Sequence, residues 1–201
     1  MKILGLSCSP RTSGNTVTLL EQALQGAKQD GAGTELYSVA GKTIEPCNAC
    51  GGCRKTGECT IKDDMQELYP KLLQADGIIF GVPVYFYSIN AQAKAIIDRT
   101  YCFNNDSKSL ANKVAGAVVT GGSLGLVSAL KDLYFFFAVK QMLPANFVAA
   151  YSHGEEGVKK REQAMKAAFD MGRQMVKIGA QNFRYPAEFK LRAIAYGTHT
   201  N

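Results

Sequence analysis

Hydrophobic residues along the chain gather in short runs that are separated by longer segments with a helical period. Residues 2–7, 77–82 and 114–119 are mostly apolar, which is typical of strands covered on both faces. Residues 34–40 and 147–151 are shorter apolar or alternating runs and predict two further strands. The pattern therefore predicts five strands with helices between them.

The intervening segments carry apolar residues at steps of three or four, which is the spacing of one helix face. Val17, Leu20 and Leu24 show this spacing in the first segment. Asp64 and Glu67 resemble a capping box that opens a second helix. The remaining helices are expected within residues 91–101, 126–142 and 158–178.

Strands that alternate with helices form a parallel sheet, and right-handed crossovers place helices on both of its faces. We therefore expect an α/β fold with three layers, α/β/α, around a doubly wound five-stranded parallel sheet. The predicted strand order is the flavodoxin-like 2-1-3-4-5. One domain is expected to span residues 1–180 with a cysteine-rich insertion at 46–60, and residues 181–201 form a C-terminal tail that is a candidate inter-subunit arm.

Length and composition fit one globular domain without a membrane span. The chain has 201 residues, of which 46% are hydrophobic and 20% charged. Its most apolar stretch, 124–143, is interrupted by Lys131, Asp132 and Lys140, so no membrane partner is expected. The first apolar run is too short for a secretory signal, which predicts a cytoplasmic protein.

The net charge indicates which kinds of ligand or macromolecule the protein binds. Lys and Arg total 23 against 17 Asp and Glu, which gives a net charge of +6. Such a surplus favours phosphorylated ligands or acidic protein partners. Nucleic acid is not expected, because the positive residues are scattered and their densest run, 159–161, is typical of the solvated start of a helix.

The loop after the first strand is rich in hydroxyl and amide side chains and leads into a helix. A helix start offers unpaired N–H groups and the positive end of the helix dipole, which bind phosphate. The loop lacks the P-loop lysine and the G-x-G-x-x-G spacing, so a monophosphate is expected rather than a pyrophosphate. Ordinary helix capping is the alternative. The candidate phosphate ligands are Ser9, Arg11, Ser13, Asn15 and Thr16.

Two further loops follow the third and fourth predicted strands and are expected at the same sheet edge. Proline is expected to end the third strand, and the aromatic rings after it suit a flat conjugated ligand. Glycines after the fourth strand let a ligand approach the backbone closely because they lack Cβ. Turn formation alone would also explain either loop. The candidate residues are Pro83, Val84, Tyr85 and Phe86 in the first loop and Thr120, Gly121 and Gly122 in the second.

Four of the six cysteines form the pattern C-x2-C-x2-C-x5-C, and they are Cys47, Cys50, Cys53 and Cys59. A zinc site usually has two separated C-x2-C pairs or one such pair with distant histidines. The second pair is missing here, and the chain's only histidines, His153 and His199, lie far off in the sequence. Three thiolates at this spacing with a fourth nearby are typical of a loop that wraps a [4Fe-4S] cluster. Zinc and free thiols are the alternatives. Because the loop follows the second strand, we expect it to open on the same sheet edge as the other loops, whereas Cys8 and Cys102 are expected to be small buried apolar residues.

The loop motifs resemble those of a known family. S-P-R-x-x-G-N-T after the first strand, together with G-V-P-V-Y and T-G-G, is similar to the NAD(P)H-dependent FMN reductase family. The resemblance covers the chain to about residue 180. It implies that FMN binds with its phosphate at the first loop, its isoalloxazine at residues 83–86 and its other edge at residues 120–122.

The cysteine motif is similar to that of iron-sulfur flavoproteins, a branch of this family that carries FMN and a [4Fe-4S] cluster. The resemblance implies an oxidoreductase that passes electrons from a ferredoxin-type or NAD(P)H donor to an acceptor, as a homodimer or homotetramer. A cluster-free NAD(P)H-dependent FMN or quinone reductase is one alternative, and a zinc-stabilised flavodoxin-like binding protein is another. Residues 134–137 cannot all face one side of a helix, so that helix is either buried all round or meets another subunit.

Overall fold

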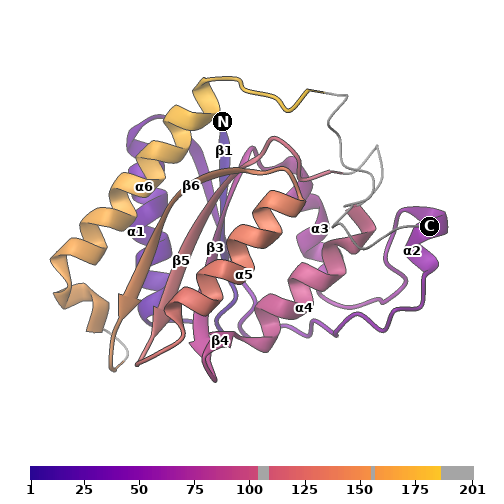
Figure 1. Cartoon of the computed structure of the whole chain (residues 1–201), viewed down its shortest axis with the longest axis horizontal. Coiled ribbons are helices and arrows are strands. Elements are labelled where there is room, and N and C mark those ends of the chain that lie inside the picture. The colour runs from indigo at the N-terminus through magenta and orange to yellow at the C-terminus, as the bar shows by residue number, and fades with distance from the viewer. Residues whose placement is uncertain (104–108, 155–156, 187–201) are drawn as a thin grey trace, which may run out of the picture.

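Five parallel strands form the centre of the molecule (Figure 1). The computed structural model describes residues 1–103, 109–154 and 157–186. The sheet order is β2-β1-β3-β5-β6, and the short β4 pairs antiparallel with β3. The strands are β1 (Lys2–Ser7), β2 (Gly33–Ser38), β3 (Gly77–Tyr85), β4 (Ser88–Ile89), β5 (Val114–Gly121) and β6 (Leu143–Tyr151). Counted along the chain, the parallel strands have the predicted order 2-1-3-4-5, so the flavodoxin-like sheet is confirmed.

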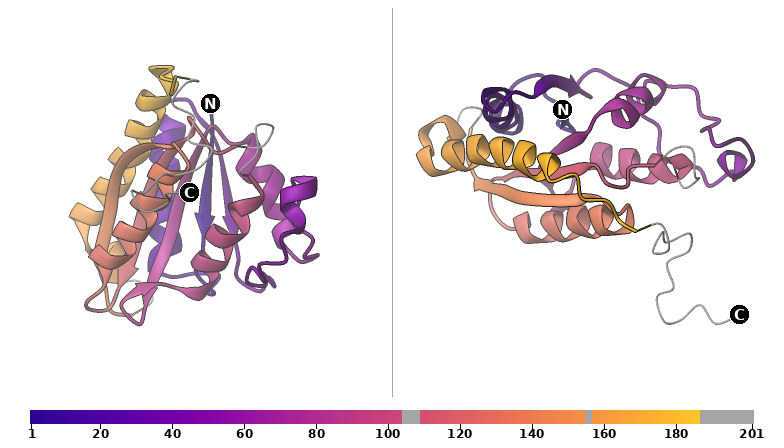
Figure 2. Two further views of the ribbon diagram at one scale, coloured as in Figure 1. Left: turned by 45° about the vertical axis from the view of Figure 1, so that its right-hand side comes forward. Right: turned by 90° about the horizontal axis from the view of Figure 1, so that it is seen from above.

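Helices cover both faces of this sheet and give the predicted three layers (Figure 2). The helices are α1 (Asn15–Gln29), α2 (Gly52–Thr56), α3 (Met65–Gln74), α4 (Ala91–Arg99), α5 (Leu126–Val139) and α6 (Glu162–Ala180). Helices α1 and α6 lie side by side on one face, and α3, α4 and α5 lie on the other. One 3-10 turn, Thr100–Phe103, follows α4, and another, Gly157–Lys160, precedes α6.

Each face of the sheet has its own hydrophobic core. Ile3 packs with α1 and α6, whereas its neighbour Leu4 packs with the helices of the opposite face. Side chains alternate along a strand, so a strand covered on both faces is apolar at every position. Helices α1 and α6 approach so closely that a Cβ on Gly172 would lie 1.8 Å from the Ala23 carbonyl oxygen. Only glycine fits at this crossing.

Strands β3 and β6 are longer than predicted. Pro83 does not end β3, which continues to Tyr85. The pairing of β3 with β1 stops at Gly81, opposite Ser7, so the missing N–H of the proline breaks no bond on that side. Strand β6 begins at Leu143, earlier than the predicted start.

The predicted capping box at the start of α3 is wrong. Asp64 makes no side-chain cap bond, and its carboxylate instead accepts the Thr43 N–H at 2.6 Å. The Glu67 carboxylate accepts a hydrogen bond from Lys42 Nζ at 2.6 Å. Asp63 caps the helix in their place, since its Oδ1 accepts the N–H of the first helical residue at 3.1 Å. The two predicted cap residues therefore anchor the loop that precedes the cysteines.

Helix α5 is not buried all round, so the first of the two alternatives for residues 134–137 is wrong. Phe136 and Phe137 are buried, but the side chain of Phe135 is 57% exposed. Tyr134 is half-buried, and its hydroxyl donates to the Ala145 carbonyl oxygen at 2.6 Å. The exposed face of this helix thus carries the apolar side chains of Val127 and Phe135, with Lys131 between them.

After α6 ends at Ala180, the chain continues through residues 181–186 without regular structure. The Tyr185 N–H there donates to Asn112 Oδ1 at 2.8 Å. The candidate inter-subunit arm lies mostly in residues 187–201, which are outside the described residues. Within the described ranges, no helix is both long and apolar enough to cross a membrane.

Candidate functional site

The loops after β1, β5 and β6 meet at the carboxyl edge of the sheet. Thr16 Oγ1 at the start of α1 and Thr120 Oγ1 at the end of β5 are buried and lie 2.7 Å apart. The Ser152 N–H after β6 donates to the Gly121 carbonyl oxygen at 2.9 Å. Gly122 follows directly and is exposed. The structure therefore brings the predicted phosphate residues at the start of α1 together with the predicted residues 120–122 at the end of β5.

The start of α1 has the features of an anion site. Its N-cap is Gly14, with a φ of 127°, and no side chain caps the helix. That φ favours glycine, and the first N–H groups of the helix are left available to a ligand. Ser9 is buried, and its Oγ accepts the Arg11 N–H at 3.1 Å. The side chains of Arg11 and Ser13 are exposed. Ordinary side-chain capping does not explain the polar residues of this loop.

Asn15 holds two loops together. Its Nδ2 donates to the Gly154 carbonyl oxygen at 2.8 Å, and its Oδ1 accepts the Val158 N–H at 3.1 Å. The loop after β6 is thereby fixed against α1, and it is a part of the edge that the sequence analysis overlooked. A Cβ on Gly122 would lie 3.6 Å from the His153 ring. The signal that could have revealed this loop is its position after the fifth predicted strand.

A strained hairpin carries the side chains that we predict to lie against a flat ligand, here called the flavin wall (residues 83–86). Phe86 and Tyr87 have φ values of 47° and 70°, the conformation of a type I′ turn that usually takes Asn-Gly. Their side chains are 98% and 56% exposed. Gly125 at the start of α5 lies against this turn, because a Cβ there would come 2.6 Å from the Tyr87 Cα. Backbone strain of this kind is concentrated at functional sites. Of the other predicted wall residues, Pro83 is buried, Val84 half-buried and Tyr85 exposed.

Buried polar atoms without a partner lie at this same edge. Among the buried side-chain oxygen and nitrogen atoms that the structure describes, those without a hydrogen-bond partner are Ser7 Oγ, Asn90 Oδ1 and Ser152 Oγ. They belong to the end of β1, the residue before α4 and the loop after β6. Buried polar groups are normally paired, so these atoms indicate a polar ligand. Together with the uncapped helix start, they fit the phosphate and the polar ring edge of the predicted FMN.

The cysteine segment lies beside the sheet, and only the first residues of its loop are at the carboxyl edge. The loop leaves β2 and runs outward to α2, which Figures 1 and 2 place at the end of the molecule remote from α6. Helix α2 packs near the 3-10 turn after α4. The expectation that the cysteines open on the same edge as the other loops is therefore wrong. The loop is instead bound at the C-terminal end of α4, where Arg99 donates to the Glu45 and Ile61 carbonyl oxygens at 2.8 and 3.3 Å.

The four predicted metal ligands are thiols on this one loop. Cys47 and Cys50 are exposed, Cys53 and Cys59 are half-buried, and none forms a disulfide. A 3.3 Å hydrogen bond with Thr60, followed by a backbone N–H, lowers the pKa of Cys50. In the part of the chain that the structure describes, no three Cys, His, Asp or Glu side chains are gathered closely enough to hold a metal ion. The donor set itself, four thiols, fits an iron-sulfur cluster or zinc.

The two cysteines outside the motif are buried in the core, as predicted. Burial raises the pKa of Cys8 to about 12, so this thiol stays protonated. Cys102 Sγ donates to the Arg99 carbonyl oxygen at 3.3 Å. Both therefore act as small core residues.

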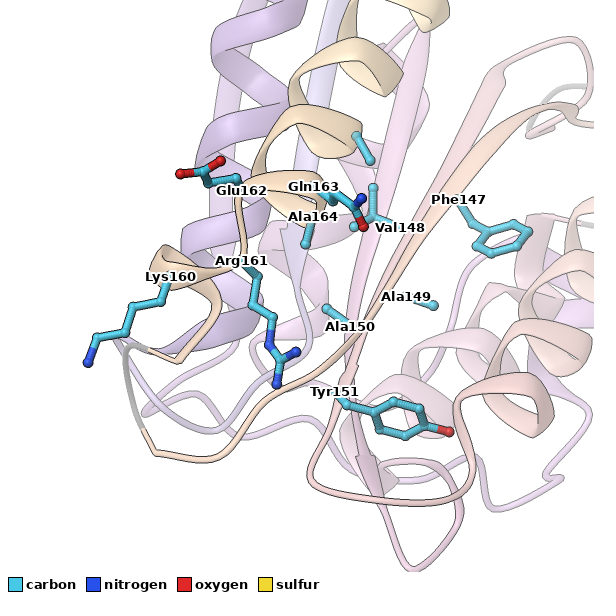
Figure 3. Close-up of a pocket in the computed structure, with 11 residues that line it drawn as sticks. Phe147, Val148, Ala149, Ala150, Tyr151, Lys160, Arg161, Glu162, Gln163 and Ala164 are labelled. Carbon is cyan, nitrogen blue, oxygen red and sulfur yellow. The ribbon is translucent and has the colours of Figure 1, made fainter.

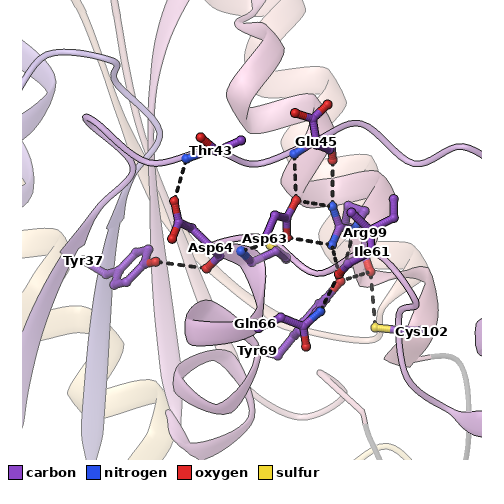
Figure 4. A network of polar contacts seen from close by, with 11 residues as sticks. Tyr37, Thr43, Glu45, Ile61, Asp63, Asp64, Gln66, Tyr69, Arg99 and Cys102 are labelled. Atoms are coloured by element: carbon purple, nitrogen blue, oxygen red, sulfur yellow. Dashed lines mark hydrogen bonds and ion pairs between the residues drawn. The ribbon is translucent and has the colours of Figure 1, made fainter.

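A buried ion pair closes the base of the cysteine loop, and the sequence analysis did not find it (Figure 4). The side chain of Arg99 at the end of α4 is 0% exposed and that of Asp63 is 4% exposed. Arg99 Nη1 donates to Asp63 Oδ2 at 2.8 Å, and Nη2 donates to Oδ1 at 3.0 Å. The same guanidinium donates to the Glu45 and Ile61 carbonyl oxygens at 2.8 and 3.3 Å and to the Tyr69 hydroxyl at 3.2 Å. No periodic pattern links these residues in the sequence.

The network keeps Asp63 ionised and Arg99 protonated although both are buried. Burial alone would raise the pKa of Asp63, but hydrogen bonds from Arg99 and from the backbone lower it. Burial would lower the pKa of Arg99, and the bonds to Asp63 and Tyr69 raise it instead. Burial, and next a hydrogen bond with the Cys59 thiol, raises the pKa of Tyr69. At neutral pH the ion pair is therefore charged and the tyrosine is neutral.

A separate hollow of about 590 Å³ lies between the edge strand β6 and the start of α6 (Figure 3). Val148 and Ala150 point from β6 toward the helix, whereas Phe147 and Tyr151 point to the other face of the strand. None of the predicted site residues lines it. The hollow is therefore distinct from the loops described above.

Comparisons with known proteins agree with the geometry. The family model of NADPH-dependent FMN reductase matches residues 1–156. An iron-sulfur flavoprotein of Methanocaldococcus jannaschii is 40% identical over 145 residues, which cover 71% of this chain and 75% of that protein. An iron-sulfur flavoprotein of Archaeoglobus fulgidus is 35% identical over 177 residues, which cover 82% of this chain and 90% of that protein.

Solved structures share the fold. An NAD(P)H:quinone oxidoreductase from Methanothermobacter marburgensis superposes with a TM-score of 0.67 at 16% identity, over 87% of this chain and 98% of that one. A flavodoxin, WrbA-like protein from Agrobacterium tumefaciens superposes with a TM-score of 0.63 at 19% identity, over 90% and 98%. At these identities the likeness concerns the fold alone.

Proposed function

Since the chain belongs to the NADPH-dependent FMN reductase family and is a flavin-dependent oxidoreductase, we propose that it acts as an iron-sulfur flavoprotein. In this proposal it passes electrons from a ferredoxin-type or NAD(P)H donor to an acceptor through FMN and a [4Fe-4S] cluster. One observation carries the proposal: a chain of this family holds four thiols, none of them in a disulfide, on a single loop. These thiols belong to Cys47, Cys50, Cys53 and Cys59.

FMN, when bound, supplies one-electron and two-electron chemistry, and the protein supplies its placement. We assign its phosphate to the N–H groups at the start of α1, with Ser9, Arg11, Ser13 and Thr16 around it. Asn15 positions this loop through its bonds to the loop after β6. We assign the isoalloxazine to residues 83–86 and 120–122, where the exposed hairpin would exclude water from one side of the ring.

The thiolates of the cysteine loop would hold the proposed cluster, which would supply single-electron chemistry there. The names of the relatives from Methanocaldococcus jannaschii and Archaeoglobus fulgidus support this assignment. Helix α4 connects the two proposed sites. Its N-cap Asn90 donates from Nδ2 to the Cys8 carbonyl oxygen at 2.7 Å, and its last residue, Arg99, binds the base of the cysteine loop. Its nine residues span about 13 Å, so one rigid element sets how the two regions lie in a single chain.

We assign a subunit interface to apolar side chains that stay exposed on the β4 hairpin, on α5 and the loop before it, and on β6. These elements contact one another, and exposed apolar patches of this kind are typical of interfaces. The exposed side chains are Phe86, Leu124, Val127, Phe135 and Phe147. The proposal is a homodimer or homotetramer. Val127→Lys combined with Phe135→Lys should shift the molecular mass measured by light scattering toward that of the monomer, and an unchanged oligomer would contradict this assignment.

The proposed place of action is the cytoplasm, where thiols stay reduced. The net charge of +6 favours an acidic electron donor, which is the charge expected for steering two proteins together. Raising the salt concentration should therefore slow electron transfer from such a donor more than transfer from NADPH.

A cluster-free NAD(P)H-dependent FMN or quinone reductase is the second candidate. The observation in its favour is that the described thiols are not gathered round one centre. The relative named a putative NAD(P)H-dependent FMN-containing oxidoreductase of Bacillus subtilis, 31% identical over 100 residues, also agrees with it. In this case NADPH alone would bleach the flavin rapidly in protein that contains no iron.

Metal analysis of anaerobically purified protein tests the proposal. We expect about four iron and four sulfide per chain and an iron-sulfur absorption that dithionite bleaches. Stoichiometric zinc without sulfide would support a zinc-stabilised protein instead. Cys50→Ser should remove the iron chromophore and leave FMN bound, whereas the matched control Cys102→Ala, outside the loop, should keep both. Retained iron in Cys50→Ser would contradict the ligand assignment.

The FMN assignment has its own test. Arg11→Ala should weaken FMN binding about tenfold or more, since it removes a charged partner of the phosphate. Riboflavin, which lacks the phosphate, should bind to Arg11→Ala and to the parent protein equally well. An unchanged FMN affinity would show that Arg11 does not contact the phosphate.

A further inference from the structure

The base of the cysteine loop is held at three points by one side chain. The loop from Glu45 to Ile61 contains all four cysteines, and Arg99 donates to the carbonyl oxygens of both of these end residues. The third point is Asp63, whose Oδ2 also accepts the Glu45 N–H at 2.8 Å. The two stems of the loop are therefore tied to each other and to the end of α4 (Figure 4).

All the donors of this guanidinium are used. An arginine side chain has five N–H groups, and the structure gives Arg99 five acceptor contacts, to Asp63 twice and to Glu45, Ile61 and Tyr69 once each. A lysine has three donors and no planar fork, so it cannot replace this set. The site is also fully buried, where removal of one member of an ion pair leaves an uncompensated charge.

The same network borders a predicted metal ligand. The Tyr69 hydroxyl accepts from Arg99 Nε at 3.2 Å and donates to the Arg99 carbonyl oxygen at 3.4 Å, and Cys59 packs against the hydrophobic core that contains Tyr69. A second contact holds the outer part of the loop, because the Arg54 guanidinium lies 5.8 Å from the centre of the Tyr101 ring, two residues beyond Arg99. The Arg99–Asp63 pair therefore lies at the base of the loop.

We propose that Arg99 is a positioning residue for the cysteine loop: it fixes both stems of the loop against α4 and neutralises the buried Asp63 carboxylate at the base of the loop. This inference rests on the proposed function and deepens it. Electrostatically, loss of Arg99 would leave the buried Asp63 carboxylate uncompensated, and this negative charge would disfavour the reduced, more negative form of a thiolate-bound cluster and so lower its reduction potential. Geometrically, the fixed stems hold the four thiols within reach of one another.

Two variants separate the geometric role from the electrostatic one. Arg99→Met removes both the charge and the hydrogen bonds, whereas Arg99→Lys keeps the charge and loses part of the bonds. Lys94→Met is the matched control, because Lys94 lies on the same helix in an exposed pair with Asp98. Three properties are measured in anaerobically purified holoprotein: iron per chain, the reduction potential of the iron chromophore, and hydrogen exchange of the amides in residues 43–46 and 60–65.

In Arg99→Met we expect exchange in the two stems to rise by about 100-fold or more, since a broken buried ion pair permits local opening. Iron per chain should fall, and the potential of the iron that remains should become more negative. Arg99→Lys should show faster exchange with a potential close to that of the parent protein, and Lys94→Met should change neither.

Parent-like exchange, iron content and potential in Arg99→Met would overturn the proposal. If Arg99→Met fails to fold and loses FMN as well, Arg99→Lys decides, because parent-like exchange of its stems would overturn the proposal equally. If the parent protein itself contains no iron or sulfide, the proposed function fails, and the exchange of the stems still decides the geometric role of Arg99.

Discussion

The strained hairpin between β3 and β4 offers a direct test of the flavin wall. Phe86 has a φ of 47° and a side chain that is 98% exposed, so the turn tolerates an unfavourable backbone for a residue that packs little. Phe86→Asn places a residue there that adopts this conformation readily. We expect the variant to be more stable than the parent protein and to bind FMN more weakly.

The magnitude follows from the geometry of the turn. The left-handed conformation costs roughly 1–2 kcal/mol for an ordinary L residue, and asparagine avoids much of this cost. The loss on the other side is the edge-to-face contact of Phe86 with Tyr87, whose ring centroids are 5.9 Å apart. An exposed aromatic contact of this kind contributes about 0.5 kcal/mol. The net gain is therefore roughly 0.5–1 kcal/mol. In a chain of this size each kcal/mol shifts Tm by about 2–4 °C, so Tm should rise by about 1–4 °C.

Phe86→Ala is the matched control, because it removes the ring and keeps a residue that is strained at this φ. Urea and thermal unfolding of the FMN-free proteins measure stability, and quenching of flavin fluorescence measures affinity. Both variants should lose about tenfold in FMN affinity if the ring contacts the flavin, and only Phe86→Asn should gain stability. Equal stability gains in both variants would refute the backbone argument. Unchanged affinity in both would remove Phe86 from the flavin wall.

Three further predictions follow from contacts in the described residues. Thr16→Val leaves a buried threonine hydroxyl without its partner, so urea unfolding should show a loss of about 1–3 kcal/mol, and a parent-like midpoint would contradict this. Gly14→Ala should weaken FMN binding and lower Tm because of the φ of 127°, and equal binding would show that the helix start is not the phosphate site. Hydrogen bonds from Lys2 and then Lys71 lower the pKa of Glu35, so its stabilisation is present above the ordinary carboxylate pKa of about 4.3 and is lost as the pH falls through the lower folded value. Between pH 6 and pH 3 the parent protein should therefore lose about 1 kcal/mol more than Glu35→Gln in urea unfolding at each pH, and equal losses would contradict the ion pair.

Much of the fold was predictable because burial leaves a local imprint on the sequence. A strand covered on both faces is apolar at every position, which revealed β1, β3 and β5, and the alternation with helices then led to the strand order. The polar loop before α1 and the cysteine spacing were also visible locally, since each is a run of neighbouring residues with one kind of chemistry. The prediction that Pro83 ends β3 was wrong because it used a local rule, that proline ends a strand, without knowledge of the strand pairing. The pairing of β3 with β1 stops at Gly81, so Pro83 breaks no hydrogen bond on that side and β3 continues.

The sequence by itself determined the class of fold, the loops that carry polar and thiol chemistry, and the family. Only the tertiary structure decided how those loops are held: the bond from Asn15 to the loop after β6, the strained turn at Phe86 and the ion pair of Arg99 with Asp63. The partners in such contacts are far apart along the chain, 36 positions in the case of Arg99 and Asp63. Their residue types gain meaning only when folding removes both from water, because a buried charge must then find its counter-charge wherever the chain has brought it.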